Sequence, residues 1–147
     1  MILISHRGNV FGPSEDENSP KLIDKALSLG YDVEIDLFCK LTWANNELFL
    51  GHDQPIYPIS YSFLAERSKH LWIHCKTLNA LNAMTPSGFN YFFHNGDDYT
   101  LTSMGYIWTY TGKPLPEFKG IACMPEEKGV DLKNAAGICS DFISLYD

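Results

Sequence analysis

The chain has 147 residues, 45% of them hydrophobic, which is enough for one domain (residues 1–147) with a single core. Its formal net charge of −7 opposes long-range attraction to nucleic acid and to anionic lipid surfaces. Apolar runs of about five residues are too short to span a bilayer, so the sequence predicts a soluble, cytoplasmic protein with no nucleic-acid and no membrane partner.

The first predicted element is a strand over residues 1–5, which ends at His6-Arg7-Gly8. Gly8 allows the chain to turn without a Cβ clash, so this strand would deliver an imidazole and a guanidinium at its carboxyl end. A surface His-Arg pair in an N-terminal turn is the alternative interpretation, because charged side chains are usually solvated.

The second predicted element is a helix over residues 19–29. Ser19 is a good N-cap, Pro20 suits the first helical position, and Gly30 follows the last turn. Four apolar residues form one stripe along this helix: Leu22, Ile23, Ala26 and Leu27. The helix would join two strands in a βαβ unit, from which parallel sheets are built.

The strand after this helix, over residues 32–37, contains Glu34 and Asp36. Because side chains alternate in direction along a strand, these two carboxylates share one face. Neighbouring acids raise each other's proton affinity unless a cation or a base lies between them, so the pair indicates a divalent metal site. An edge strand with an acidic solvent face is the alternative.

The rest of the chain continues the alternation of strands and helices. His52-Asp53 closes another apolar run, and helices are predicted over residues 60–69 and 77–84. Five further apolar runs predict strands: 71–75, 91–94, 105–110, 120–124 and 137–143. The order of the elements predicts an α/β protein with seven or eight strands and three helices.

Four cysteines, at positions 39, 75, 123 and 139, are scattered along the chain without a C-x-x-C spacing. Most of them lie within apolar strands. We interpret them as small buried hydrophobic residues in a reducing compartment, and not as a disulfide framework or a zinc site.

Several of these motifs, taken in order, resemble the N-terminal signature of the glycerophosphodiester phosphodiesterase family, within the superfamily of phosphatidylinositol-specific phospholipase C-like phosphodiesterases. The matching residues are His6-Arg7-Gly8, Glu17-Asn18-Ser19, Ala26-x-x-x-Gly30, Glu34-Ile-Asp36 and His52-Asp53. Further similar segments follow at Trp72–Lys76, Tyr106–Tyr110 and Gly137–Asp141. The resemblance implies a TIM-type barrel with its site at the carboxyl ends of the strands.

A complete barrel of this type needs roughly 250 residues. The chain of 147 residues would therefore form a reduced TIM-type (β/α) barrel with seven to eight mainly parallel strands and few helices. Segment 54–70 is also too short for the insertion that many family members have there. A barrel with few helices leaves the outer faces of some strands uncovered. We therefore expect a surface rich in Tyr and Phe to be buried by self-association, for example in a homodimer.

The resemblance also implies roles for the candidate residues. The implied catalytic residues are His6, His52, Arg7 and Lys76, with the two histidines as general acid and base and the two cationic side chains neutralising the phosphate. The implied metal ligands are Glu34 and Asp36, for Mg²⁺ or Ca²⁺. Histidine suits acid–base work because it titrates near neutral pH.

His74 stands where the family has a third acidic ligand. An imidazole in the metal shell favours Mn²⁺ or Zn²⁺ over Mg²⁺ and Ca²⁺. Alternatively, water fills that position, or His74 is only satisfied by a backbone carbonyl. We expect His94 near the substrate, with a structural role as the alternative, and Trp108 as a wall of the pocket. Asp141 either orients a histidine or caps the end of the barrel.

The sequence thus predicts a phosphoric diester hydrolase, a metal-dependent phosphodiesterase. Its substrate would be a small soluble phosphodiester of the glycerol-, inositol- or sugar-phosphate type. The alternative is a non-catalytic module that binds a phosphate ligand on the same barrel. A structural or interaction protein on a decayed scaffold is a third hypothesis, opposed by the presence of both candidate histidines and of Lys76.

Overall fold

The computed structural model describes residues 1–147 as a single mixed α/β structure. Its strands are β1 (Ile2–His6), β2 (Asp32–Leu41), β3 (Asn46–Leu50), β4 (Tyr57–Ile59), β5 (Leu71–Cys75), β6 (Tyr91–Phe92), β7 (Tyr99–Leu101), β8 (Ile107–Thr109), β9 (Gly120–Cys123) and β10 (Ala135–Ser140). Its helices are α1 (Pro20–Ser28), α2 (Tyr61–Arg67), η1 (Ser68–His70), α3 (Leu78–Met84) and η2 (Ile143–Tyr146). None of these helices combines the length and apolar character that crossing a bilayer requires.

All ten strands belong to one sheet, whose parallel centre is formed by β9, β10, β1 and β2. Strands β5 and β6 extend the sheet beyond β2, and β8 and β7 extend it beyond β9. Six of the nine strand pairings are parallel. The predicted α/β class, the mainly parallel sheet and the three α-helices are confirmed, whereas the predicted count of seven or eight strands was too low.

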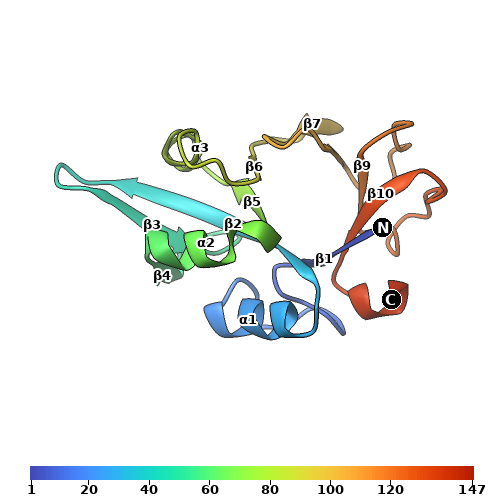
Figure 1. The fold of residues 1–147 in the computed structure, drawn as a ribbon, viewed down its shortest axis with the longest axis horizontal. Coiled ribbons are helices and arrows are strands. Elements are labelled where there is room, and N and C mark those ends of the chain that lie inside the picture. The colour runs from blue at the N-terminus through green and yellow to red at the C-terminus, as the bar shows by residue number, and fades with distance from the viewer.

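The sheet curls but does not close into a barrel (Figure 1). No ladder joins its end strands β6 and β7, and β6 is only two residues long. Ser103 spans the gap instead: its backbone N–H donates to the Tyr91 carbonyl (2.8 Å), and its hydroxyl accepts from the Tyr91 N–H (2.9 Å) and donates to the Phe89 carbonyl (2.8 Å). The strand pairings therefore do not close the sheet into the TIM-type barrel that the resemblance implies.

Helix α1 and the βαβ unit form as the sequence predicts. The Ser19 hydroxyl accepts the Leu22 N–H (3.1 Å), Pro20 opens the helix, and the chain leaves it through Gly30 with φ of +92°. The apolar stripe buries Ile23 completely. The strands on either side, β1 and β2, pair in parallel and place His6 beside Glu34.

Two apolar clusters lie on opposite faces of the curled sheet. The larger cluster includes Val33, Ile35 and Leu37 of β2 and packs under the helices. The smaller cluster lies on the inner face, and its buried members are Ile4, Trp72, Phe92, Trp108, Ile121 and Cys139. Because side chains alternate along β2, Glu34 and Asp36 point to this inner face.

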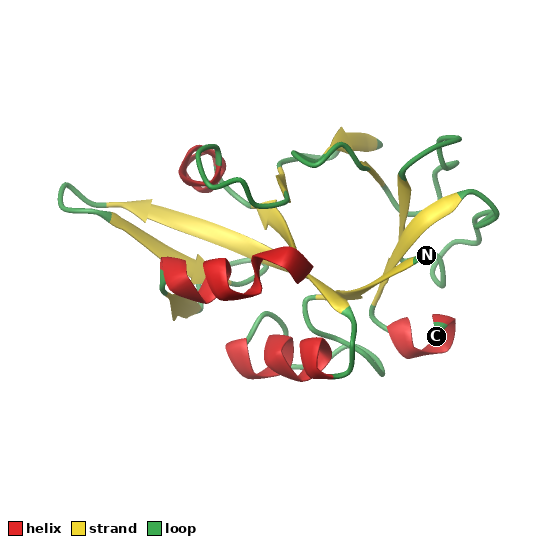
Figure 2. Ribbon diagram, viewed as in Figure 1, coloured by secondary structure: helices red, strands yellow, loops and turns green.

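Strand β2 is unusually long because it takes part in two separate sets of ladders. Its first part pairs in parallel with β1 and β5, and its second part, Leu37–Leu41, pairs antiparallel with β3. Residues 37–59 form a hairpin arm that projects from the body of the molecule, with Trp43 fully exposed at its tip (Figure 2). The sequence did not predict this arm, because the turn lacks the Asn-Gly or Asp-Gly signal of a tight hairpin.

Candidate functional site

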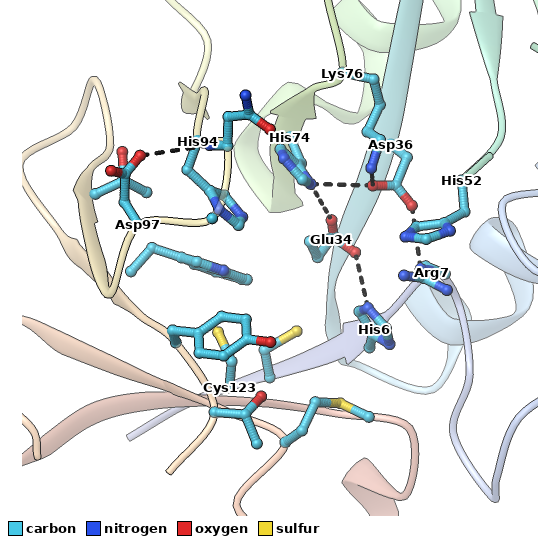
Figure 3. A pocket seen from close by; sticks show the side chains of 18 of the residues that line it. His6, Arg7, Glu34, Asp36, His52, His74, Lys76, His94, Asp97 and Cys123 are labelled. Atoms are coloured by element: carbon cyan, nitrogen blue, oxygen red, sulfur yellow. Dashed lines mark hydrogen bonds and ion pairs between the residues drawn. The ribbon is translucent and has the colours of Figure 1, made fainter. Parts of the chain in front are cut away.

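A pocket of about 540 Å³ lies at the carboxyl ends of the central strands. All nine candidate site residues line it: His6, Arg7, Glu34, Asp36, His52, His74, Lys76, His94 and Trp108. Figure 3 shows the labelled side chains converging from β1, β2 and β5 and from the segments that follow β1, β3, β5 and β6, and Trp108 adds a wall from β8. Residues far apart in the chain therefore meet around one cavity, as the sequence predicts.

Glu34, Asp36 and His74 form the inner cup of this pocket. Each offers a ligand atom, and the three atoms lie within 4.8 Å of one another. His74 Nδ1 lies 3.1 Å from Asp36 Oδ1 and 3.8 Å from Glu34 Oε1. The geometry follows from the sheet, because β2 presents both carboxylates on one face and β5 pairs His74 with Asp36 in register.

The charges in this cup fit a divalent cation. Glu34 is 2% exposed, and its Oε2 atom has no hydrogen-bond partner. Burial and the neighbouring Asp36 raise the pKa of Glu34. Burial would also raise the pKa of Asp36, but His74, Arg7 and Asn18 hold it well below its ordinary value. An unpaired buried carboxylate oxygen is costly, and a cation held by two carboxylates and an imidazole would satisfy it.

Asn18 fixes the position of Asp36 from the opposite side of the cup. Its Nδ2 donates to Asp36 Oδ2 (3.0 Å), and its Oδ1 accepts from the Asp36 backbone N–H (2.9 Å). Asn18 is fully buried, and its backbone adopts the left-handed conformation with φ of +64°. Asparagine tolerates this conformation better than most residues. Sequence reasoning noted Asn18 as part of a motif but assigned it no role, although a buried left-handed Asn is a structural signal of its own.

Two cationic side chains border the same carboxylate. Arg7 Nε lies 3.1 Å from Asp36 Oδ2, and Lys76 Nζ lies 3.8 Å from Asp36 Oδ1. Arg7 is anchored further by donating from Nη1 to Glu17 Oε2 (3.0 Å). Both cations therefore line the pocket close to the cup, where an anionic ligand would meet them.

His6 is held by Asp141, which lies just beyond β10. Its Nδ1 donates to Asp141 Oδ1 (2.8 Å), and that oxygen also accepts from Asn9 Nδ2 (2.8 Å). His6 Nε2 lies 3.9 Å from Glu34 Oε2. Burial alone would lower the pKa of His6, but the bond with Asp141 and the charge of Glu34 raise it above its usual value. Of the two roles considered for Asp141, orienting a histidine matches this geometry.

His52 reaches the pocket from the end of β3. Its Nδ1 lies 2.7 Å from Asp53 Oδ1, and its side chain is 42% exposed, which makes it much more open than His6. The turn before it depends on Gly51, whose φ is +156° and where an added Cβ would lie 1.9 Å from the Gln54 carbonyl oxygen. Only glycine fits this close approach of the backbone.

The opposite wall of the pocket is aromatic. The ring of His94 stacks on that of His74, with centroids 4.5 Å apart. Burial, together with the nearby side chains of His74 and Lys76, lowers the pKa of His94 to about 4, so His94 is neutral near pH 7. Trp108 is buried and stacks on Phe92 at 4.6 Å, which suits a wall and not a chemical role.

Two thiols also line the pocket, and the sequence did not suggest them as site residues. Cys123 ends β9 and Cys139 lies on β10. Burial raises the pKa of both thiols well above the usual value, so both are protonated near neutral pH.

No family model, no curated protein and no solved structure matches this chain. The resemblance of this sequence to the phosphodiesterase family therefore rests on short motifs alone. The geometry of the pocket is the remaining guide to function.

Proposed function

We propose that this protein is a metal-dependent phosphodiesterase that cleaves a small soluble phosphodiester of the glycerol-, inositol- or sugar-phosphate type. The observation that supports this most is the single pocket in which two histidines and two cationic side chains border a cup of two carboxylates and an imidazole. We interpret the curled, open sheet as a reduced TIM-type barrel. Its pocket lies at the carboxyl ends of the strands, where such folds have their sites.

Glu34, Asp36 and His74 would hold the metal. A cation bound there supplies Lewis-acid charge that stabilises the developing charge on phosphoryl oxygens. Mg²⁺ and Ca²⁺ prefer oxygen ligands, whereas the imidazole of His74 favours Mn²⁺ or Zn²⁺.

His6 is the candidate general acid. Its Nδ1 proton is engaged by Asp141, which leaves Nε2 facing the cup. A raised pKa favours the protonated imidazole, whose Nε2 proton would pass to the leaving oxygen of the ester.

His52 is the candidate general base. It reaches the pocket from a separate element, and its exposure allows exchange with solvent. It would accept the proton of the attacking hydroxyl, supplied by water or by the substrate alcohol.

Arg7 and Lys76 would neutralise the phosphate. In the ligand-free pocket both of them flank Asp36, which a bound cation would also neutralise. Lys76, and the part of the Arg7 guanidinium that Glu17 does not engage, would then bind the phosphoryl oxygens.

The direct test is to incubate the purified protein with Mg²⁺, Ca²⁺, Mn²⁺ or Zn²⁺ and a panel of glycerophosphodiesters, and to follow the products by phosphorus NMR. We expect a phosphomonoester or a cyclic phosphate to form only when metal is present. His6→Ala and His52→Ala should each reduce the rate about 10²- to 10⁴-fold, the usual contribution of general acid–base catalysis.

His70→Ala is the matched control, because His70 pairs with Asp32 (2.8 Å) and does not line the pocket. This variant should retain full activity. Saturable binding of a phosphodiester without any turnover would reject the enzyme and establish the phosphate-binding module.

A further inference from the structure

The pocket is larger than a metal ion and a phosphate group require. Its volume of about 540 Å³ is in the range of sites that hold whole small-molecule ligands. The groups with a role in the proposed reaction come from β1, β2, β5 and the segments that follow β1, β3 and β5. Six further lining residues come from β7, β8 and the segments after β6, β8 and β9, and we call them the distal wall: His94, Asp97, Thr100, Trp108, Tyr110 and Glu127.

The sheet and its loops bring the distal wall together. Thr100 of β7 and Trp108 of β8 are register partners, so their side chains share the inner face of the sheet. Just beyond β8, the Tyr110 N–H donates to the Asp98 carbonyl (2.8 Å), which ties this strand end to the loop that contains Asp97. Figure 3 shows Asp97 on the side of the pocket away from Asp36. The distal wall is therefore a connected surface beside the carboxylate cup, and not part of it.

The charge of the distal wall determines what it can hold. Arg7 and Lys76 are the only Lys or Arg side chains that line the pocket, and both of them flank Asp36. The distal wall instead presents the carboxylates of Asp97 and Glu127. A second phosphate or a carboxylate on the substrate would be repelled there. The alcohol that this wall holds therefore carries no negative charge.

The hydrogen-bonding groups of the distal wall match hydroxyl groups. His94 is held by stacking on His74, and its Nδ1 has no hydrogen-bond partner. The Thr100 hydroxyl donates to the Phe93 carbonyl (3.0 Å), so its oxygen can still accept. Tyr110 is 50% exposed, and its phenol group both donates and accepts. Hydroxyl groups also do both, whereas a trimethylammonium group has no hydrogen-bonding atom.

We propose that the distal wall binds a sugar ring, so that one alcohol of the substrate is a monosaccharide that carries no phosphate of its own. The assignment rests on the proposed phosphodiesterase function, in which the metal, Arg7 and Lys76 hold the diester phosphate. Trp108 and Tyr110 supply aromatic surface for the apolar C–H groups of the ring, and Asp97 and Glu127 accept from its hydroxyl groups.

The test compares the binding of three defined diesters in the presence of Mn²⁺. They are a glycerol phosphodiester of glucose, the same compound with an additional phosphate on the sugar, and glycerophosphocholine. Isothermal titration calorimetry with the His6→Ala variant measures Kd without turnover. We expect the glucose diester to bind at least about tenfold more tightly than each of the other two, the gain that one or two net hydrogen bonds provide.

Two substitutions at exposed positions test the wall directly. Asp97→Asn and Tyr110→Phe should each reduce the preference for glucose over choline by about 3- to 10-fold, because each weakens or removes one hydrogen bond to the ring. Asp98→Asn is the matched control, since Asp98 is also exposed but pairs with Lys113 (3.3 Å) and does not line the pocket. It should keep the wild-type preference.

The outcomes separate the sugar assignment from the proposed function. Equal affinity for the glucose and choline diesters, or weaker choline binding alone in Asp97→Asn, overturns the sugar assignment and leaves phosphodiester binding intact. A preference for glucose in a wild-type protein that cleaves none of the diesters rejects the phosphodiesterase and supports the distal wall. Failure of all three diesters to bind overturns both.

Discussion

Glu34 is the residue on which the metal site depends most. It is buried, its pKa is raised, and one oxygen has no partner. A carboxyl group whose pKa is higher in the folded than in the unfolded state lowers the free energy of unfolding as pH rises from its unfolded pKa through its folded pKa. The reason is that folding then opposes ionisation of the group.

Glu34→Gln should therefore raise the thermal stability of the metal-free protein near pH 7 and abolish tight binding of Mn²⁺. Differential scanning calorimetry and isothermal titration calorimetry measure these two effects. Glu47→Gln, at an exposed position of β3, is the control and should change neither quantity. A wild-type affinity for Mn²⁺ in Glu34→Gln would show that the cation binds elsewhere.

His6 and Asp141 provide a prediction about proton affinity. Because the hydrogen bond with Asp141 raises the pKa of His6, Asp141→Asn should lower that pKa in the metal-free protein. NMR titration of the imidazole resonances measures the change. The imidazole signals of His70, which pairs with Asp32 outside the pocket, serve as the reference.

The same pair predicts the sign of a pH effect on stability. His6 has a raised pKa in the folded state, so its contribution is fully present below the ordinary value of 6.5 and is lost as pH rises through the folded pKa. Asp141→Asn should reduce the fall in the free energy of unfolding that occurs as pH rises through the folded pKa of His6. A profile identical to that of the wild type would exclude the pair as its source.

At the scale of elements, the turn between β3 and His52 offers the sharpest test. Gly51→Ala would force a Cβ into the Gln54 carbonyl, so the loop must move and His52 with it. We expect a loss of about 1–3 kcal/mol in the free energy of unfolding, typical of local backbone strain, together with a large loss of activity. Mn²⁺ binding should remain, because the cup lies on β2 and β5.

Gly129→Ala is the control for this change, since nothing lies within 4 Å of its added Cβ. Urea unfolding and Mn²⁺ titration of both variants separate a local shift from general destabilisation. If Gly51→Ala loses metal binding and activity together, the turn affects the whole pocket and not His52 alone.

Elements with strong local signals could be predicted from the sequence. Ser19-Pro20 and the apolar stripe defined α1, and alternation placed Glu34 and Asp36 on one face. The bond between His6 and Asp141 could not be assigned, because it joins the first strand to the end of the last one. The thiol pair escaped notice for the same reason: Cys123 and Cys139 become neighbours only through the register of β9 and β10.

For the whole molecule, a bound cation should act as a stabilising ligand. At a free concentration of 100 times Kd, a ligand that binds only the folded state adds about 2.7 kcal/mol. For a chain of this size we expect Tm to rise by about 5–10 °C. Thermal unfolding with and without Mn²⁺ measures the shift, which a chelator should reverse and Glu34→Gln should eliminate.

The long strand β2 links the projecting arm mechanically to the pocket. It runs without a break from Glu34 and Asp36 into the arm, and β3 returns the chain to His52. Trp43 at the tip and His52 at the base therefore belong to one continuous hairpin, whereas His6 lies on β1, outside it.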